Sequence, residues 1–483
     1  MPRNAKIVCT LGPSSSTKTV IKKLIRAGMD VARLNFSHGD HESHLKMINL
    51  IRECSREAGK PVAILQDLQG PKLRVGLLPA EGIQLTAGTN VRLFLVGEFV
   101  QSFTKDKIAL PIDVPNLTRA VKIGNRILLD DGKLELHVTE VQENYVDTRV
   151  VLGGILHSHK GVNLPGTDLG IDHFTEKDRA DLIFGLQQDV DYIAISFVDT
   201  AADIQQVKKF IAEIDPKKAN IPVIAKLERP LAIKNLHEII HSSEGVMVAR
   251  GDLGVETSPS LVPIVQKEII QIANQHAKLV ITATQMLESM IENPRPTRAE
   301  ASDVANAVFD GTDALMLSAE TASGCYPVES VLMMNSIICE AEKHKTEWGH
   351  GGDFPVSALQ DDALAISNAA KTLAHDRDVA NVAVFTQSGK TALLMSKTRP
   401  RVPIIAFTPE SKTLAAMSLF WGVHPVFVPF ANSLEEMVRS LDNYLIERKQ
   451  LKVGEQVVLI SGFPVGAMRL PNLALLHTIG EEV

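Results

Sequence analysis

Short apolar runs alternate with helix-like patterns through most of the first 345 residues. An uninterrupted apolar run predicts a strand buried on both faces, as in a parallel sheet covered by helices. Helices are predicted between these runs, for example at Thr17–Ala27, His41–Glu57 and Glu176–Gln188. The predicted strands are Lys6–Leu11, Val31–Phe36, Val62–Gln66, Tyr192–Val198, Pro222–Glu228, Val246–Ala249, Lys278–Ala283 and Ala314–Leu317.

The alternation stops once, between about Lys72 and Leu164, where short β patterns and turn signals replace it. Strands are predicted at Asn90–Val96, Arg126–Leu129 and Lys133–Val138, and Asp131-Gly132 is a strong hairpin signal between the last two. Without this segment, eight strand–helix units total about 250 residues, the usual size of a (β/α)8 barrel. We therefore expect an α/β fold whose barrel comprises residues 1–71 and 165–345, with residues 72–164 forming an inserted small β-barrel lid domain.

The remainder of the chain predicts a third unit. Trp348–Asp353 has the composition of a linker, and a helix is predicted at about Leu359–Ala374. Five strands follow, the earlier ones separated by helices, which indicates an open-sheet α/β domain over residues 354–483. These strands are Asn381–Phe385, Pro403–Phe407, Val426–Val428, Gln456–Ile460 and Leu473–His477.

Composition narrows the class of protein. The chain of 483 residues is 45% apolar and 22% charged, as expected for an ordinary globular protein. A net charge of −7 and an aromatic content of 5% argue against a dedicated nucleic-acid binder. The apolar runs are too short to cross a membrane, and the N-terminus has no signal-peptide core. Four scattered cysteines indicate reduced thiols and a cytoplasmic protein.

The stretch Val246–Glu256 carries the first chemical signal. Its apolar strand ends in Arg250, Gly251 and Asp252, so that a carboxylate and backbone N–H groups meet at a strand's carboxyl end. For this stretch alone, a plain strand followed by an Asp-capped loop is the commoner explanation. The pattern recurs, however, at every predicted barrel strand, and the carboxyl ends of barrel strands are where barrel enzymes place their chemistry.

The polar residues at these ends include two carboxylates, Glu228 and Asp252, and the cations Arg33, Lys226 and Arg250. Each alone is commonly a solvated strand terminus. Together they suit a hard divalent cation beside a phosphate, whereas no Cys/His cluster supports zinc. The residues alone therefore predict a magnesium-dependent enzyme acting on a small phosphorylated acid. The other strand-end residues are Thr10, Asn35, Ser37, His38, Asp67, Ser196, Thr284, Ser318 and Glu320.

Six stretches resemble the pyruvate kinase family, of the bacterial type, and they occur in the family's order along essentially the whole chain. They are Val31–Gly39, Lys160–Gly166, Val246–Glu256, Ile281–Met290, Pro296–Glu300 and Asp303–Val308. The resemblance implies a barrel with a β-barrel lid and a regulatory C-terminal domain. It also implies the last step of glycolysis, in which phosphoenolpyruvate and ADP give pyruvate and ATP.

The resemblance also implies roles for individual residues. Lys226 and Arg33 would contact the transferred phosphoryl group, and Glu228 and Asp252 would hold Mg²⁺ or Mn²⁺. The groups expected at the substrate carboxylate and at the enolate proton are Gly251, Asp252, Ser196, Thr284 and Ser318. The nucleotide-side positions are Asn35, His38, Arg74 and Lys160, the last delivered by lid closure.

One position departs from much of the family. Many members bind K⁺ through groups matching Asn35, Ser37, Asp67 and the carbonyl of Leu68, and they carry a glutamate where this chain has Lys72. An ammonium group can replace a monovalent cation in charge if it reaches the same pocket. We therefore expect Lys72 to fill the pocket and activity not to require K⁺.

A second candidate site lies in Val384–Thr391, a strand, a hydroxyl-rich loop and a helix start. Backbone N–H groups and a lysine there suit a phosphate, although an ordinary strand–helix turn has the same pattern. By resemblance this is the loop that binds an allosteric sugar phosphate or AMP, and the family implies a homotetramer. The expected contacts are Thr386, Ser388, Gly389, Lys390 and Thr391; Arg399 and Arg401 lie nearby in sequence but are not placed.

Two alternatives remain open at this point. Another barrel enzyme acting on a phosphorylated keto acid, such as a Mg²⁺-dependent lyase or aldolase, would explain the strand-end carboxylates but not Lys160 on a lid. A non-catalytic binding or RNA-associating protein would explain the scaffold, but it conflicts with the acidic charge and the intact set of polar residues.

Overall fold

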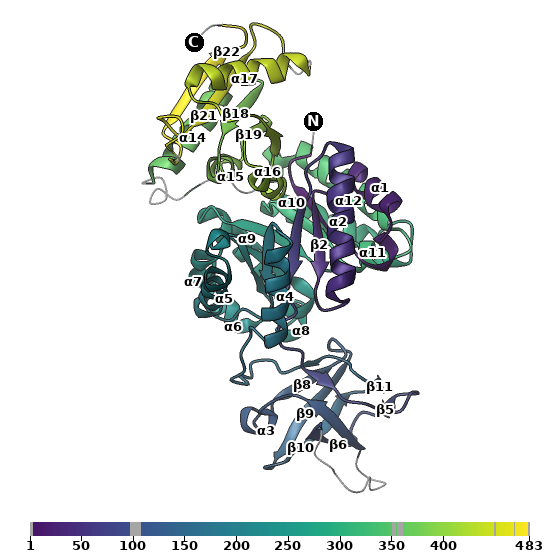
Figure 1. Cartoon of the computed structure of the whole chain (residues 1–483). Helices are drawn as coiled ribbons and strands as arrows, with labels where there is room; N and C mark the ends of the chain where they lie inside the picture. Colours follow the sequence, from purple (N-terminus) through teal and green to yellow (C-terminus); the bar gives the residue numbers. More distant parts are fainter. Residues whose placement is uncertain are drawn as a thin grey trace.

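The computed structural model describes residues 3–96, 108–349, 354, 361–448, 451–467 and 469–481. Three parts follow one another along a single axis (Figure 1). A closed barrel lies in the middle, a β-rich part lies at one end of it, and the C-terminal α/β part lies at the other end.

The barrel consists of eight parallel strands in the order β1-β17-β16-β15-β14-β13-β3-β2, and pairing of Lys6 with Ala314 closes it. This confirms the predicted fold. The expected strand Tyr192–Val198 stops at Ile195, and Phe197 has a left-handed backbone with φ of 56°. The strands are β1 Lys6–Thr10, β2 Val31–Asn35, β3 Ala63–Asp67, β13 Tyr192–Ile195, β14 Val223–Leu227, β15 Gly245–Ala249, β16 Leu279–Ala283 and β17 Ala314–Leu317.

Alternate residues of each barrel strand are buried against different partners, which explains the continuous apolar runs. Ile7, Leu34 and Ile64 pack against the surrounding helices, whereas Val8 and Leu65 fill the barrel interior. The principal covering helices are α1 Lys18–Ala27, α2 His41–Ala58, α4 Glu176–Gln187, α5 Ala201–Ile214, α7 Leu236–Ser242, α9 Val262–Gln275, α10 Arg298–Asp310 and α12 Pro327–Lys343. Shorter helices are α6 Pro230–Lys234, α8 Arg250–Glu256, α11 Ala319–Ala322 and α13 Lys345–Trp348.

The segment between β3 and β13 forms a seven-stranded sheet and a separate two-stranded sheet. A bridge between Arg74 and Gly161 brings the two edges of the larger sheet together, so that the sheet curls back on itself. The hairpin expected at Asp131-Gly132 joins β8 to β9. The elements are β4 Arg74–Val75, β5 Ile83–Leu85, β6 Asn90–Leu95, β7 Ile108–Asp113, α3 Leu117–Ala120, β8 Arg126–Leu129, β9 Leu134–Val141, β10 Tyr145–Leu152, β11 Gly154–Leu156 and β12 Val162–Asn163. The exact domain limits remain predictions.

The C-terminal part is an open sheet in the order β20-β19-β18-β21-β22, in which only β22 is antiparallel to its neighbour. The strand expected at Val426–Val428 lies earlier, as β20 Val423–Phe427. The helix expected from Leu359 is described from Asp362, and Leu359 and most of the predicted linker lie outside the described residues. The other elements are α14 Asp362–Asp376, β18 Asn381–Phe385, α15 Lys390–Lys397, β19 Ile404–Thr408, α16 Ser411–Ala416, α17 Leu434–Glu447, β21 Gln456–Ser461 and β22 Leu473–Thr478.

A buried ionic junction joins the C-terminal part to the amino-terminal ends of the barrel strands. Asp313 accepts hydrogen bonds from Lys397 Nζ at 2.6 Å and from Arg399 Nη2 at 2.8 Å. Lys6 Nζ also donates to the carbonyl of Val423 at 2.7 Å. The carboxyl ends of the strands therefore face the opposite way, toward the curled sheet.

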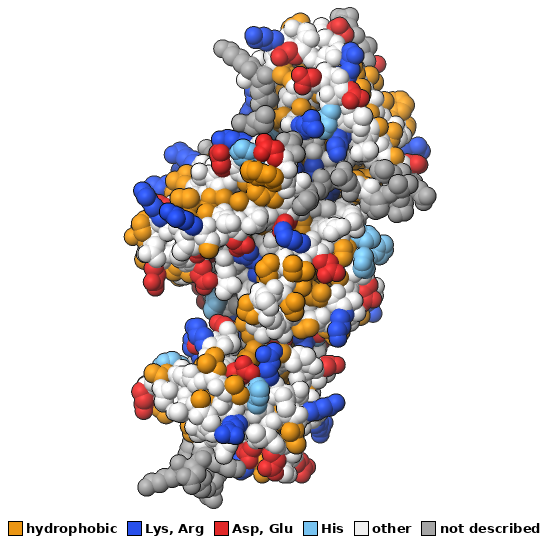
Figure 2. All heavy atoms as spheres, turned by 180° about the vertical axis from the view of Figure 1, so that it is seen from behind, with side chains coloured by type: hydrophobic (Ala, Val, Ile, Leu, Met, Phe, Trp, Pro, Cys, Tyr) orange, Lys and Arg blue, Asp and Glu red, His pale blue; other side chains and the backbone are white. Residues whose placement is uncertain are grey.

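Figure 2 shows the surface from behind, with acidic and basic side chains interspersed over the three parts. No described helix is long and apolar enough to cross a membrane. All four cysteines are free thiols.

Candidate active site

A cavity of about 610 Å³ lies between the mouth of the barrel and the curled sheet. It brings together most of the residues that the sequence singled out. From the barrel it is lined by Arg33, Asn35, Ser37, His38, Ser196, Lys226, Glu228 and Asp252, and from the inserted part by Lys72, Arg74, Asp130 and Lys160. The predicted residues Asp67, Leu68, Gly251, Thr284 and Ser318 are not among the described residues that line it.

Lys226, near the end of β14, is the centre of a charged cluster at this mouth. Its Nζ lies 2.9 Å from Glu228 Oε1 and 3.3 Å from Asp67 Oδ1, and it donates to Ser196 Oγ at 2.7 Å. Asp67 also accepts from Arg33 Nε at 2.6 Å. Because β2, β3, β13 and β14 are neighbours in the barrel, side chains far apart in sequence converge here.

Burial and charge act in opposite directions within this cluster. Burial lowers the pKa of Lys226, but Asp67 and Glu228 outweigh it and raise that pKa above its ordinary value. Burial would raise the pKa of Asp67, but Lys226 and Arg33 hold it below its usual range. Lys226 and Asp67 are therefore both charged at neutral pH.

Glu228 and Asp252 differ from Asp67 in carrying raised pKa values. Burial raises the pKa of Glu228 to about 7. The nearby charge of Lys226 lowers this pKa, and that of Asp252 raises it. Burial also raises the pKa of Asp252. No group of three or more His, Cys, Asp or Glu suited to a metal occurs within the described residues. Two buried carboxylates whose pKa values stay raised even beside Lys226 fit a hard divalent cation such as Mg²⁺.

Behind Asp252, the ends of β15 and β16 are tied together. The amide of Gly251, expected to face a substrate, donates to Thr284 Oγ1 at 2.8 Å, because α8 begins at Arg250 where a turn was expected. Thr284 has φ of 67° and Gln285 has φ of 57°. Such backbone conformations cost of order 1–3 kcal/mol each and mark functional sites when neighbouring groups hold them.

Ser318, at the end of β17, has a buried hydroxyl with no hydrogen-bond partner in the described structure. Its backbone N–H donates to Glu320 Oε2 at 2.6 Å, and the N–H of Leu287 donates to Oε1 of the same carboxylate at 3.1 Å. A buried hydroxyl without a protein partner is a site for an ordered water or a ligand atom.

The expected nucleotide-side residues Asn35, His38, Arg74 and Lys160 all line the cavity. Lys160 Nζ is paired with Asp130 Oδ1 at 2.8 Å, beside the β8–β9 hairpin. The ion pair therefore anchors this lysine to its own sheet.

Lys72 reaches one of the groups expected around a monovalent cation, because its Nζ donates to the carbonyl of Ser37 at 2.8 Å. Burial, Arg74 and Lys177 lower the pKa of Lys72 to about 8. The other expected groups have protein partners. Asn35 Oδ1 accepts from the Ser37 N–H at 3.1 Å, and the Leu68 carbonyl accepts from Ser196 Oγ at 2.7 Å.

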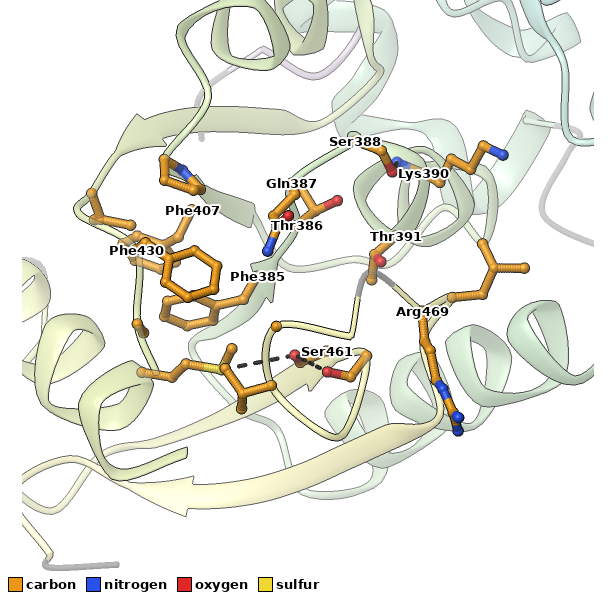
Figure 3. A pocket seen from close by; sticks show the side chains of 18 of the residues that line it. Phe385, Thr386, Gln387, Ser388, Lys390, Thr391, Phe407, Phe430, Ser461 and Arg469 are labelled. Carbon is orange, nitrogen blue, oxygen red and sulfur yellow. Dashed lines mark hydrogen bonds between the residues drawn. The ribbon is translucent and has the colours of Figure 1, made fainter. Parts of the chain in front are cut away.

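The second candidate site lies about a pocket of some 620 Å³ between the C-terminal sheet and the barrel. Thr386, Ser388, Lys390 and Thr391 line it, and Gly389, with φ of 82°, donates its N–H to Thr386 Oγ1 at 2.9 Å. In Figure 3, Phe385, Phe407 and Phe430 gather on one side of this pocket, while the side chain of Lys390 extends away from its middle. Arg399 is absent from the pocket lining because it belongs to the Asp313 junction.

Two contributions to the mouth were missed from the sequence. Arg250 was noted only as a strand-end charge, but its guanidinium holds the carbonyl of Thr284. Phe197 donates its N–H to Glu228 Oε2 at 2.8 Å from a left-handed backbone. Nothing in the local sequence signals the conformation of Phe197, which depends on contacts between distant strands.

Comparison with known proteins gives consistent matches. Residues 2–331 match the family described as "Pyruvate kinase, barrel domain", and residues 364–477 match "Pyruvate kinase, alpha/beta domain". The chain is 42% identical over 486 residues to a pyruvate kinase of Geobacillus stearothermophilus, covering 100% of this chain and 81% of that one. It is also 42% identical over 482 residues to a pyruvate kinase of Mycobacterium tuberculosis, covering 100% of both chains. A solved pyruvate kinase structure from Cryptosporidium parvum has a TM-score of 0.90 at 33% identity, covering 99% of this chain and 96% of that one.

Proposed function

The chain belongs to the pyruvate kinase family, whose members transfer a phosphoryl group from phosphoenolpyruvate to ADP, and we propose that it does so in the cavity at the barrel mouth. The observation that carries this assignment of the site is the convergence of Lys226, Arg33, Glu228 and Asp252 on one cavity. Phosphoryl transfer depends on positioning and charge neutralisation more than on covalent help from the protein.

In this proposal Lys226 and Arg33 hold the phosphoryl group. The ion pair between Arg33 and Asp67 fixes one edge of the guanidinium, and Arg33 Nη1 donates to Thr10 Oγ1 at 2.9 Å. Lys226 is a mobile point charge whose present partners are carboxylates and a hydroxyl, so it can turn to an incoming anion.

Members of the family depend on a divalent metal, and Glu228 and Asp252 would hold Mg²⁺ or Mn²⁺. Such an ion would supply positive charge against the negative charge of the substrate and of the group in transfer. The raised pKa values of both carboxyl groups support this role, because a cation would offset the cost of their shared negative charge.

Ser196, Thr284, Gly251 and Ser318 would serve the rest of phosphoenolpyruvate. The hydroxyl of Thr284 and the Gly251–Asp252 segment would receive the substrate carboxylate. The Gly251 N–H would then have to break its hydrogen bond to Thr284 Oγ1 and donate to the substrate carboxylate instead. The unpartnered hydroxyl of Ser318 would hold the water through which the enolate carbon gains its proton.

ADP would bind on the side of the cavity formed by Asn35, His38, Arg74 and Lys160. Lys160 would leave Asp130 for the nucleotide phosphates when the curled sheet closes over the barrel. Closure of this kind would also exclude water from the transferred group.

We further propose that K⁺ is not required. The contact between Lys72 and the Ser37 carbonyl, together with the partners of Asn35 and Leu68, supports a pocket already satisfied by protein groups. Rates measured with tetramethylammonium in place of K⁺ test this, and strong stimulation by added K⁺ would contradict it.

The loop Thr386–Thr391 would bind the phosphate of a sugar phosphate or AMP and thereby regulate the enzyme. Its position in a pocket that also contacts barrel residues Lys208 and Glu244 supports regulation across the domain boundary. Phosphoenolpyruvate saturation curves with glucose 6-phosphate, ribose 5-phosphate, AMP and fructose 1,6-bisphosphate test the idea, and unchanged curves throughout would remove it. We also propose that the protein is a cytoplasmic homotetramer, and the molar mass measured by light scattering tests the number of subunits.

The site is tested by coupling ATP formation to a luminescent readout with phosphoenolpyruvate, ADP and Mg²⁺. We expect turnover by the wild type and a loss of about 1,000-fold or more in Lys226→Met, since one preorganised charge at the reacting group is commonly worth that much. Absence of ATP formation, together with cleavage of a carbon–carbon bond in a phosphorylated keto acid, would favour a lyase or aldolase. Absence of any turnover would favour a non-catalytic binding protein.

A further inference from the structure

Two consecutive residues at the end of β16 have left-handed backbones. Thr284 has φ of 67° and Gln285 has φ of 57°. A β-branched residue such as Thr strongly disfavours this region, so a conformation of this kind persists only where neighbouring groups hold it. The peptide between these residues therefore needs an anchor.

Arg250, the first residue of α8, supplies that anchor. Its Nε and Nη2 both donate to the carbonyl oxygen of Thr284, at 3.2 and 2.7 Å. The side chain is buried, with 8% of its surface exposed. The planar fork of a guanidinium fixes the direction of a bound carbonyl in a way that a single ammonium cannot.

The opposite edge of the guanidinium is held from outside the barrel. Arg250 Nη1 donates to Asp303 Oδ2 at 2.6 Å and to Gln266 Oε1 at 3.4 Å. Asp303 lies on α10, and its side chain is 37% exposed. A continuous chain of contacts therefore runs from Asp303 through Arg250 to the backbone of Thr284.

We propose that Arg250 is a positioning residue for phosphoryl transfer: oriented by Asp303, it holds Thr284 in its left-handed conformation and so fixes the Thr284 hydroxyl for the reaction. This inference rests on the role proposed above for Thr284. The hydroxyl has a defined direction, because it accepts from the Gly251 N–H at 2.8 Å and donates to the Ala283 carbonyl at 2.6 Å. Arg250 contacts the backbone carbonyl of Thr284, so its effect on the reaction is exerted through Thr284.

Release of the Thr284 carbonyl would let the strained peptide relax and turn the hydroxyl away from Gly251. Gly251 and Asp252 follow Arg250 directly in α8. The Arg250 guanidinium therefore links the end of β15, which carries the Asp252 carboxylate, to the end of β16, which carries the Thr284 hydroxyl. A shift of this kind lowers kcat by misplacing a group, and small misplacements near a reacting centre can cost about 100-fold.

The test is a double-mutant cycle in the full-length protein. Asp303→Asn and Arg250→Lys are each made in the wild type and in Thr284→Ala, and kcat and KM are measured for phosphoenolpyruvate and ADP. We expect about a 10-fold loss of kcat for Asp303→Asn and about 100-fold for Arg250→Lys, with KM for ADP unchanged. In the Thr284→Ala background both losses should shrink to less than about 2-fold, because the positioned hydroxyl is gone.

Asp189→Asn is the matched control. Asp189 is also a partly exposed carboxylate, paired with Lys218 at 2.9 Å and with Lys412 at 2.8 Å, but it lies at the other end of the barrel. Its kcat should stay within about 2-fold of wild type. Thermal unfolding is recorded for every variant, and Asp303→Asn carries the test if Arg250→Lys does not fold.

Each outcome bears on a different claim. Equal losses of kcat in both backgrounds, or no loss for Asp303→Asn, would overturn the positioning role of Arg250. Full kcat in Thr284→Ala would overturn it as well, while leaving the Lys226 site intact. Full activity in Lys226→Met would instead refute the proposed active site.

Discussion

Replacing Asp313 with Asn should destabilise the protein strongly, although Asp313 lies far from the active site. Its carboxylate is fully buried between two buried cations, with Lys397 at 2.6 Å and Arg399 at 2.8 Å, and it also accepts the Val280 N–H at 2.7 Å. Asn keeps the size and an acceptor oxygen but removes the only negative charge among these contacts. Lys397 and Arg399 would then keep neutral acceptors, Asn274 Oδ1 and the Gly311 carbonyl, and the charge of Glu342 would act on Arg399 alone.

The magnitude follows from how each cation can respond. Burial already lowers the pKa of Lys397 to about 8, so Lys397 can lose its proton. At pH 7, deprotonation of Lys397 limits its contribution to the loss of stability to between about 1 and 2 kcal/mol, because one pKa unit is worth about 1.4 kcal/mol. Arg399 cannot lose its proton in practice, and removing one partner of a buried ion pair commonly costs about 3–5 kcal/mol. The two contributions together give an expected loss of about 4–7 kcal/mol.

Urea unfolding followed by tryptophan fluorescence is a suitable assay. The chain has two tryptophans, and Trp421 lies at the junction, with Arg399 Cζ 4.7 Å and Lys345 Nζ 3.9 Å from its ring centroid. Glu340→Gln, which breaks an exposed pair with Lys343, is the control and should leave the midpoint unchanged. A loss below about 1 kcal/mol for Asp313→Asn would refute the reasoning, because it would mean that other groups stabilise the charges of Lys397 and Arg399 without Asp313.

Three further predictions concern other individual charged residues. Lys72→Glu should create a K⁺ requirement by turning the cation at the Ser37 carbonyl into an anion, and equal rates with and without K⁺ would count against it. Burial raises the pKa of Asp191 to about 7, so the wild type should lose stability as pH rises from about 4 to 7 and stay level above that. Asp191→Asn should therefore gain up to about 4 kcal/mol over wild type at pH 8 but nothing at pH 4, and a gain that is independent of pH would exclude this cause. Glu228→Gln should raise the Mg²⁺ concentration needed for half-maximal activity by about 10-fold or more, measured by titration with Mg²⁺, and an unchanged titration would remove Glu228 from the metal site.

The barrel and the composition of its mouth were accessible from sequence because both depend on local patterns. Continuous apolar runs mark strands with two buried faces, and the residue following each run is placed at the mouth by the parallel topology alone. Lys226 and Glu228, two residues apart near the end of β14, share a side of that strand for the same reason.

Other features were not accessible because they depend on contacts between distant segments. The sequence near Asp313 shows nothing to indicate that Lys397 and Arg399 reach it from another domain. The left-handed Thr284 likewise has its carbonyl held by Arg250, which lies one strand away. The amide of Gly251 was expected to be free, but the unforeseen helix start at Arg250 directs it to Thr284.

The order in which the barrel strands pair constrains how a growing chain can fold on the ribosome. One edge of β1 stays unpaired until β17 has been synthesised, because Lys6 pairs with Ala314. One edge of β3 likewise stays unpaired until β13 has been synthesised, because Leu65 pairs with Tyr192. The larger sheet of the inserted part, by contrast, draws all its strands from residues 74–163. During synthesis, therefore, the insert can complete its hydrogen bonding while the first three barrel strands still expose unpaired edges, and the nascent barrel stays vulnerable to association with other chains until Leu317 has emerged.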